Sequence, residues 1–300
     1  MSTAQHKRLA IDIGVPAVFV VLWSTGFIGA RLGLPHAEPM TFLAVRFALV
    51  AGLLIAFSLA VRAPWPRGRR EIFHIAVAGL LVHGVYLGGV FASIDHGVET
   101  GVSALIVGLQ PLLVAALALP FLGERLTLRQ WAGLLLGLAG VALVITRKLE
   151  VGLGTPVGMA LSVLALFGLT LGTLYQKRFC SHMDLRTGNA VQLSAACIAT
   201  GAIAWAFETG RIEWTGSFIF ALAWLVFVLS LGAFSLLFLM IRRGAAVQVS
   251  SLLYLVPPVT ALFGWWLFDE AFGPLALLGM AVAVIGVGLV LFVPKSAGHG

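Results

Sequence analysis

The stretch LYLVPPVTALFGWWLFDE, residues 253–270, and its counterpart VGLQPLLVAALALPFLGE, residues 107–124, decide the fold of this chain. Each stretch is apolar almost to its end, and each has the pattern P-x12-E, with the proline near its middle. A proline inside a water-soluble helix costs about 3 kcal/mol. Membrane helices tolerate proline where neighbouring helices, hydroxyl groups or cavity water satisfy the carbonyl groups that it frees. The repeated break therefore indicates a membrane protein whose interrupted helices line a cavity.

The composition supports lipid as the main solvent of the chain. Of its 300 residues 60% are hydrophobic and 10% are charged, and the mean hydropathy is +1.04. Soluble domains contain about 25% charged residues. A helix needs about 20 apolar residues to cross a bilayer, and runs of this kind lie at 13–33, 39–61, 72–94, 99–121, 128–146, 155–176, 187–207, 217–240, 247–268 and 273–293. We therefore predict an all-α integral membrane protein with ten transmembrane helices.

The basic residues predict the orientation of these helices. A net charge of +7 would also suit a nucleic-acid-binding protein, but most of the 19 Lys and Arg residues fall in alternate connections, on one side of the membrane. Cytoplasmic loops of membrane proteins carry such an excess. We therefore expect both termini in the cytoplasm and no nucleic-acid partner.

The chain contains an internal repeat with a shift of 146 residues. Pro111 matches Pro257 and Glu124 matches Glu270, and the glycines that follow match as well. The two halves span 13–146 and 155–293. Each half holds five runs, an odd number, so the second half enters the membrane from the opposite side. Inverted repeats of this kind form transporters that present one midplane site to each side in turn.

Three features carry a family resemblance: the paired P-x12-E-x8-G-x6-G-V segments, the WSTGFIGARL motif of the first run, and the layout of five plus five. Over nearly its whole length the chain resembles EamA-type members of the drug/metabolite transporter superfamily, and within it bacterial amino-acid exporters. The resemblance implies a multi-pass protein of the bacterial cytoplasmic (inner) membrane that exports neutral and aromatic amino acids or similar small metabolites. We expect it to be a monomer whose partners are its small-molecule substrate and the lipid bilayer.

Polar side chains at membrane depth are functional candidates by default, because lipid makes them costly. The candidate substrate-binding residues are His83, Tyr86, Trp23, Ser24, Gln110, Tyr254, Ser251 and Arg46. Pro111, Pro257 and Pro258 are candidate helix breaks or hinges. Packing between helices would equally explain most of these residues. Instead of binding substrate, Arg46 could form an ion pair with Glu38 or extend its side chain to the outer surface of the membrane.

The hydroxyl groups near the proline pair have an expected role of their own. We expect Ser250, Ser251 and Thr260 to satisfy the carbonyl groups that Pro257 and Pro258 free. In this interpretation the hydroxyl groups stabilise the break in the helix.

The position of the acidic residues restricts the transport mechanism. All 12 Asp and Glu residues fall in connections or at the ends of runs, whereas cation-coupled transporters usually carry a carboxylate at depth. We therefore predict facilitated export by alternating access through a mostly apolar cavity. The alternative is export of another small metabolite or drug, coupled to protons through His83, since histidine titrates near neutral pH.

Other classes of function lack their motifs. The sequence contains no H-E-x-x-H, no nucleophile elbow and no phosphate-binding glycine loop. Cys180 and Cys197 have no metal-ligand spacing. We therefore expect no enzyme activity, no cofactor and no metal site. A membrane scaffold would need neither the repeat nor polar groups at depth.

Overall fold

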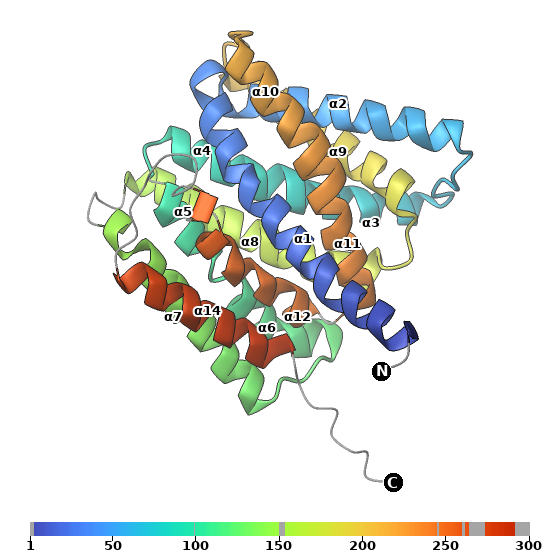
Figure 1. Ribbon diagram of the computed structural model, residues 1–300. Coiled ribbons are helices and arrows are strands. Elements are labelled where there is room, and N and C mark those ends of the chain that lie inside the picture. The colour runs from blue at the N-terminus through green and yellow to red at the C-terminus, as the bar shows by residue number, and fades with distance from the viewer. Residues whose placement is uncertain are drawn as a thin grey trace.

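Apolar helices make up almost all of the chain in the computed structural model, which describes residues 3–98, 100–149, 154–244, 246–259, 262–263 and 274–291 (Figure 1). Within these residues the only β-pairing is the isolated bridge between Ala37 and Ile212. Five helices are long and apolar enough to cross a membrane: Pro39–Ala60, Arg69–Asp95, Pro156–Phe179, Leu185–Phe207 and Gly216–Arg243. Further apolar helices are shorter. The predicted all-α membrane fold is confirmed at this level.

The helices of the first half begin and end close to the predicted runs, except that the first begins at Thr3 and not at residue 13. They are α1 (Thr3–Gly33), the 3-10 helix η1 (Leu34–His36), α2 (Pro39–Ala60), α3 (Arg69–Gly79), the π-helix η2 (Leu80–Leu87), α4 (Gly88–Asp95), α5 (Thr100–Val107), α6 (Gln110–Leu122) and α7 (Leu128–Leu149). α3, η2 and α4 follow one another without a gap, and the turn at 108–109 separates α5 from α6.

The second half repeats this order of elements. Its helices are α8 (Pro156–Phe179), α9 (Leu185–Phe207), α10 (Gly216–Trp224), the π-helix η3 (Leu225–Ala233), α11 (Phe234–Arg243), α12 (Ala246–Ser251), the 3-10 helix η4 (Leu252–Leu255) and α14 (Pro274–Leu291). A shift of 146 residues places η3 almost on η2, and it places the break at η4 beside the break at 108–109. The irregularities recur together with the regular helices.

The two halves pack on each other through matching elements. α2 packs on its own counterpart α9, and α7 packs on its counterpart α14. α6 packs on α12, the counterpart of α5, and α1 packs on η3 as its counterpart α8 packs on η2. Figure 1 shows α7 and α14 side by side at one end of the bundle and α2 with α9 at the other. Such pairing is what an approximate two-fold relation between the halves requires.

Glycines allow α7 and α14 to approach closely. A Cβ atom added at Gly133 would lie 2.6 Å from the carbonyl oxygen of Gly286, and one added at Gly140 would lie 2.6 Å from that of Gly279. Small residues serve this purpose in membrane helices, where lipid provides no hydrophobic force between them. These repeated glycines therefore serve close packing between the two halves.

The two repeated prolines each start a new helical segment. Pro111 lies in the first turn of α6, where a missing N–H costs nothing because the first turn has no partner for it. Pro257 follows η4, and the N–H of Val256 donates to the carbonyl of Leu253, which is the group that Pro257 would leave free. Both segments are therefore interrupted close to the repeated prolines.

The expected role of the hydroxyl groups is wrong for the residues that can be checked. The Ser251 hydroxyl donates to the carbonyl of Gln248 at 2.8 Å, and the Ser250 hydroxyl accepts from Gln110 at 3.2 Å. The tighter 3-10 turn of η4 satisfies the Leu253 carbonyl instead. Thr260 and Glu270 lie outside the described residues.

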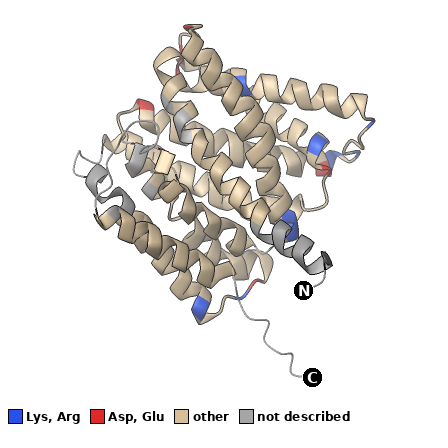
Figure 2. Cartoon of the chain, in the orientation of Figure 1, with Lys and Arg blue, Asp and Glu red and all other residues tan. Residues whose placement is uncertain are grey.

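Charged residues lie mainly at helix ends and in connections, and the helix interiors are largely uncharged (Figure 2). The carboxylates whose side chains the structure describes follow this rule: Glu38, Glu71, Asp95, Glu124, Asp184, Glu208 and Glu213. Several of them join the halves. Glu208 accepts from the N–H groups of Met40 and Thr41 at the start of α2, and Glu124 accepts from the N–H of Ala246 at the start of α12.

Candidate functional site

Trp23 and Tyr86 form the centre of the candidate site. Trp23 lies on α1 and Tyr86 on η2, and their nearly parallel rings have centroids 6.5 Å apart. The Trp23 ring also contacts Phe234 of α11, with centroids 4.6 Å apart. Both predicted residues are buried. The aromatic cluster therefore connects the two halves of the chain.

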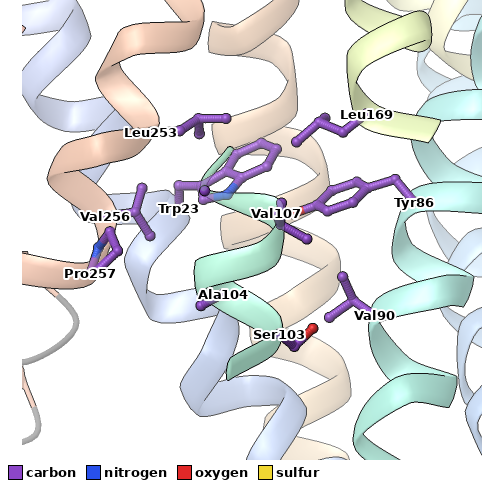
Figure 3. A pocket seen from close by; sticks show the side chains of 11 residues that line it. Trp23, Tyr86, Val90, Ser103, Ala104, Val107, Leu169, Leu253, Val256 and Pro257 are labelled. Carbon is purple, nitrogen blue, oxygen red and sulfur yellow. The ribbon is translucent and has the colours of Figure 1, made fainter. Parts of the chain in front are cut away.

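Two small cavities lie beside this aromatic pair, each of about 40 Å³. The first is lined by Trp23, Tyr86, Val90, Ser103, Ala104, Val107, Gly108, Leu169, Leu253, Val256 and Pro257 (Figure 3). The second is lined by Trp23, Gly26, Ala30, Arg46, Tyr86, Leu87, Val90, Phe91, Ile94, Leu229 and Phe234. A cavity needs about 10–15 Å³ of such volume to hold one water molecule. Each cavity therefore has room for water but not for an amino acid, and the structure is closed around the aromatic pair.

Arg46 is the charged member of the second cavity, which we call the Arg46 cavity. The side chain is 0% exposed, and its Nε and Nη2 both donate to the hydroxyl of Ser230, each at 3.0 Å. Its Nη1 has no hydrogen-bond partner among the described residues. The pair with Glu38 is not formed, because Glu38 instead accepts from the N–H and the hydroxyl of Thr209, at 2.7 and 2.6 Å.

The Arg46 guanidinium thus has no counter-charge from the described carboxylates, which lie at helix ends and in connections. A buried charge without a partner is costly. A carboxylate is the group that a guanidinium binds best, because two parallel N–H donors match its two oxygens. The arrangement can therefore receive an anionic oxygen group next to an aromatic surface.

His83 does not line either of the two small cavities. Its ring is 1% exposed and packs against Phe47, Phe234 and Phe238, with centroids 5.8, 4.6 and 6.0 Å away. Neither ring nitrogen has a hydrogen-bond partner among the described residues. In this conformation His83 has an apolar environment although it lies on the same helix as Tyr86.

The other predicted binding residues join helices in this conformation. Gln110 donates to the hydroxyls of Thr173 and Ser250, at 3.4 and 3.2 Å. The Ser24 hydroxyl lies 2.7 Å from the carbonyl oxygen of Val20 and 3.3 Å from that of Val256 on the interrupted segment.

Tyr254 packs against α7, because a Cβ atom at Gly137 would overlap its ring. Of the predicted prolines, Pro257 lines the first cavity; Pro111 and Pro258 are absent from the linings of both small cavities. The structure therefore brings Trp23, Tyr86, Arg46 and Pro257 to the two cavities.

Several contacting residues were not among the sequence candidates. Ser230 accepts the hydrogen bonds of Arg46, Phe234 lines the Arg46 cavity, and Gln176 and Gln192 form a buried amide pair. An amide inside an apolar run is a visible signal, but these two lie close to the ends of their predicted runs. Ser230 and Phe234 carry no such signal, because serine and phenylalanine are common in membrane helices.

Two further observations concern the rest of the described chain. A groove of about 770 Å³ lies between α2, η2, α4, α8 and α9, and its lining contains none of the predicted site residues. Among the residues that the structure describes, no group of three or more His, Cys, Asp or Glu side chains could hold a metal ion.

Comparison with known proteins identifies the relatives of this chain. The EamA-like transporter family matches residues 13–146 and again residues 156–292. The uncharacterized transporter YvbV of Bacillus subtilis is 27% identical, over 91% of this chain and 89% of its own. The uncharacterized inner membrane transporter YedA of Escherichia coli is 26% identical over 95% and 92%, and a probable amino-acid metabolite efflux pump of Escherichia coli is 26% identical over 93% and 94%.

One solved crystal structure has a similar fold, with a TM-score of 0.76. The sequences are 20% identical, and the match covers 93% of this chain and 96% of the other. This likeness supports the helical arrangement alone.

Proposed function

Because this chain belongs to the EamA-like transporter family, we propose that it exports neutral and aromatic amino acids, or similar small zwitterionic metabolites, across the bacterial inner membrane. The name of one relative, a probable amino-acid metabolite efflux pump, supports this substrate class. In the proposal the chain has ten spans in two inverted halves, with both termini in the cytoplasm. The halves move against each other so that the central site opens to each side in turn.

The observation that carries the proposal is the buried guanidinium of Arg46, which lines a cavity and has no carboxylate partner among the described residues. In the proposed complex its free Nη1 binds the substrate carboxylate. Trp23 and Tyr86 contact the apolar or aromatic side chain, whose favourable geometry is an offset or edge-to-face contact. The cavity enlarges on opening, since about 40 Å³ does not hold an amino acid.

The mutation Arg46→Met tests this assignment. Hydrogen bonds to a charged group are worth about 1.5–3 kcal/mol, so we expect the KM for phenylalanine to rise roughly 10- to 100-fold. Arg46→Lys keeps the charge but loses the planar fork, and we expect an intermediate KM. Flux into or out of proteoliposomes is measured for alanine, leucine, phenylalanine and tryptophan.

Arg211→Met is the matched control, because it removes the same charge from an exposed connection. We expect it to leave the KM unchanged. An unchanged KM in Arg46→Met would contradict the role of Arg46. If the unmodified protein transports no neutral amino acid, the proposed substrate class is wrong and the substrate is some other metabolite.

Proton coupling through His83 is the second candidate, favoured by its two unpartnered ring nitrogens. It predicts uphill accumulation of substrate when a pH gradient is imposed, and loss of this accumulation in His83→Ala. Facilitated transport predicts the same final distribution of substrate with and without the gradient. The two candidates therefore give opposite results in one experiment.

A further inference from the structure

The internal repeat relates the Arg46 cavity to a second set of side chains. A shift of 146 residues takes each lining residue to a counterpart in the other half. The counterparts are Leu169 for Trp23, Gly172 for Gly26, Gln176 for Ala30, Gln192 for Arg46, Gly232 for Tyr86, Met240 for Ile94, His83 for Leu229 and Gly88 for Phe234. If the two halves exchange conformations, the counterparts must form the corresponding cavity.

Three of these counterparts are buried polar side chains on different elements. His83 lies on η2, Gln176 on α8 and Gln192 on α9, and all three are at most 2% exposed. Gln192 donates to Oε1 of Gln176 at 2.7 Å. Oε1 of Gln192 and both ring nitrogens of His83 have no hydrogen-bond partner among the described residues. Burying polar atoms without a hydrogen-bond partner destabilises the conformation that does so.

The counterpart set differs from the Arg46 cavity in charge and in bulk. Gln192 stands where the first half has Arg46, so the set has no cation. Gly232 and Gly88 stand in the positions of Tyr86 and Phe234, so the counterpart set lacks two bulky rings. The polar atoms of the set include an amide oxygen and the acceptor nitrogen of a neutral imidazole, and an ammonium group offers three donors to such acceptors.

We propose that the opposite-facing conformation contains a second substrate station, lined by His83, Gln176 and Gln192, that binds the ammonium group of the amino acid. The Arg46 cavity binds the carboxylate when it is enlarged and open to the other side of the membrane. This inference rests on the proposed function, because it needs the two halves to exchange conformations. Arg46 and Gln192 each lie seven residues after the start of their paired helices, α2 and α9. In the inverted arrangement the two stations therefore face opposite sides of the membrane.

Cysteine labelling tests whether the second station opens to water. Met240 lines it as the counterpart of Ile94, and Met240→Cys is made in a background with Cys180→Ser and Cys197→Ala. Ile241→Cys is the matched control, because Ile241 is the next residue and is also buried (1% exposed against 8% for Met240), but its counterpart Asp95 does not line the Arg46 cavity. We expect a membrane-impermeant maleimide, added on the side of residues 180–184, to label Met240→Cys at least tenfold faster than Ile241→Cys. Equal labelling rates for the two variants would contradict the proposal of a second station.

Protection by ligands tests the chemistry of the station. We expect phenylalanine and phenethylamine, which carry an ammonium group, to slow the labelling of Met240→Cys, and 3-phenylpropanoate, which lacks it, to have no effect. Adding Gln192→Met or His83→Phe should raise the concentration needed for half-protection at least fivefold. Protection by 3-phenylpropanoate equal to that by phenylalanine, or labelling without any protection, would overturn the ammonium site.

Flux measurements separate this inference from the proposed function. If the unmodified protein transports phenylalanine while Met240→Cys reacts no faster than Ile241→Cys, the second station is wrong and the exporter proposal stands. If phenylalanine is not transported and the labelling difference remains, the substrate class is wrong and the opening of the second cavity stands.

Discussion

Asp184 illustrates how one side chain at the residue scale starts a helix. Its carboxylate accepts from the N–H groups of Arg186 and Thr187, at 2.9 and 3.4 Å, and caps α9. The guanidinium of Arg186 also donates to it, at 3.0 and 2.7 Å. These hydrogen bonds, first of all that from the Arg186 side chain, lower the pKa of Asp184 below its ordinary value.

We predict that Asp184→Ala lowers stability by about 0.5–2 kcal/mol, the usual cost of losing such a cap. Because the pKa of the folded state is below the unfolded value of about 3.9, the stabilisation by charge is complete above that value. It is lost as the pH falls through the folded pKa. Thermal unfolding of the detergent-solubilised protein between pH 7 and pH 3 measures this difference. Asp184→Asn keeps a capping oxygen without titration, so a wild-type advantage over this variant that persists unchanged at pH 3 would contradict the prediction.

Single residues of the site were predictable where their chemistry is unusual for lipid. Trp23, Tyr86 and Arg46 were candidates, and the structure brings them to one cavity. The partner of Arg46 was not predictable, since Ser230 is 184 residues away and serine is unremarkable in a membrane helix. The role of His83 was not predictable either, because its surroundings depend on Phe234 and Phe238 of the other half.

At the scale of elements, the prediction concerns the interrupted segment that contains Pro257. In Pro257→Ala the new N–H can donate to the carbonyl of Leu253, which favours a continuous α-helix in place of η4. Val256 and residue 257 line the first cavity, so this change displaces part of its wall. We predict about tenfold slower phenylalanine flux, equivalent to about 1.4 kcal/mol, with unchanged expression.

Pro120→Ala is the control for this change, because Pro120 lies inside α6 and is exposed. We expect normal flux from it. Normal flux in Pro257→Ala combined with poor expression would show that the proline serves folding and not transport.

Most helix positions were predictable to within a few residues, because apolar length and the proline breaks define them. The start of α1 at Thr3 was not, because residues 3–12 are more polar than the run that follows. The π-helices η2 and η3 were not predictable. Their sequences, LLVHGVYL and LVFVLSLGA, have the same apolar character as the α-helical residues on either side. The wider turn depends on packing against α8 and α1. π-Helical turns occur often at functional sites, and here they hold Tyr86, His83 and Ser230.

At the scale of the whole molecule, the crossing of α7 and α14 joins the two halves. We predict that Gly286→Leu lowers the unfolding temperature, because its side chain would meet the backbone of Gly133 and Gly137. Overpacking of this kind costs about 1–3 kcal/mol or more. Gly288→Leu is the control on the same helix, since a Cβ atom there has no neighbour within 4 Å. Equal unfolding temperatures for the two variants would contradict the importance of this crossing.

The 146-residue shift predicted which segments are equivalent, and the pairing of α2 with α9 and of α7 with α14 agrees with it. The closed state of the centre could not be predicted. The size of a cavity depends on how the rings of Trp23, Tyr86 and Phe234 meet across the halves, and the repeat contains no information on that contact.

Because equivalent helices pair with each other, the fold resembles a dimer whose two subunits are joined in one polypeptide. In a homodimer every substitution appears in both subunits, so a cation beside the axis would always be present twice. Joining the halves in one chain removes this restriction, and position 46 holds arginine while position 192 holds glutamine. In the proposed inverted arrangement the tandem chain can therefore present chemically different surfaces to the two sides of the membrane. Such a difference cannot by itself drive net movement, but it allows each face to be tuned to the ligand concentration that it meets.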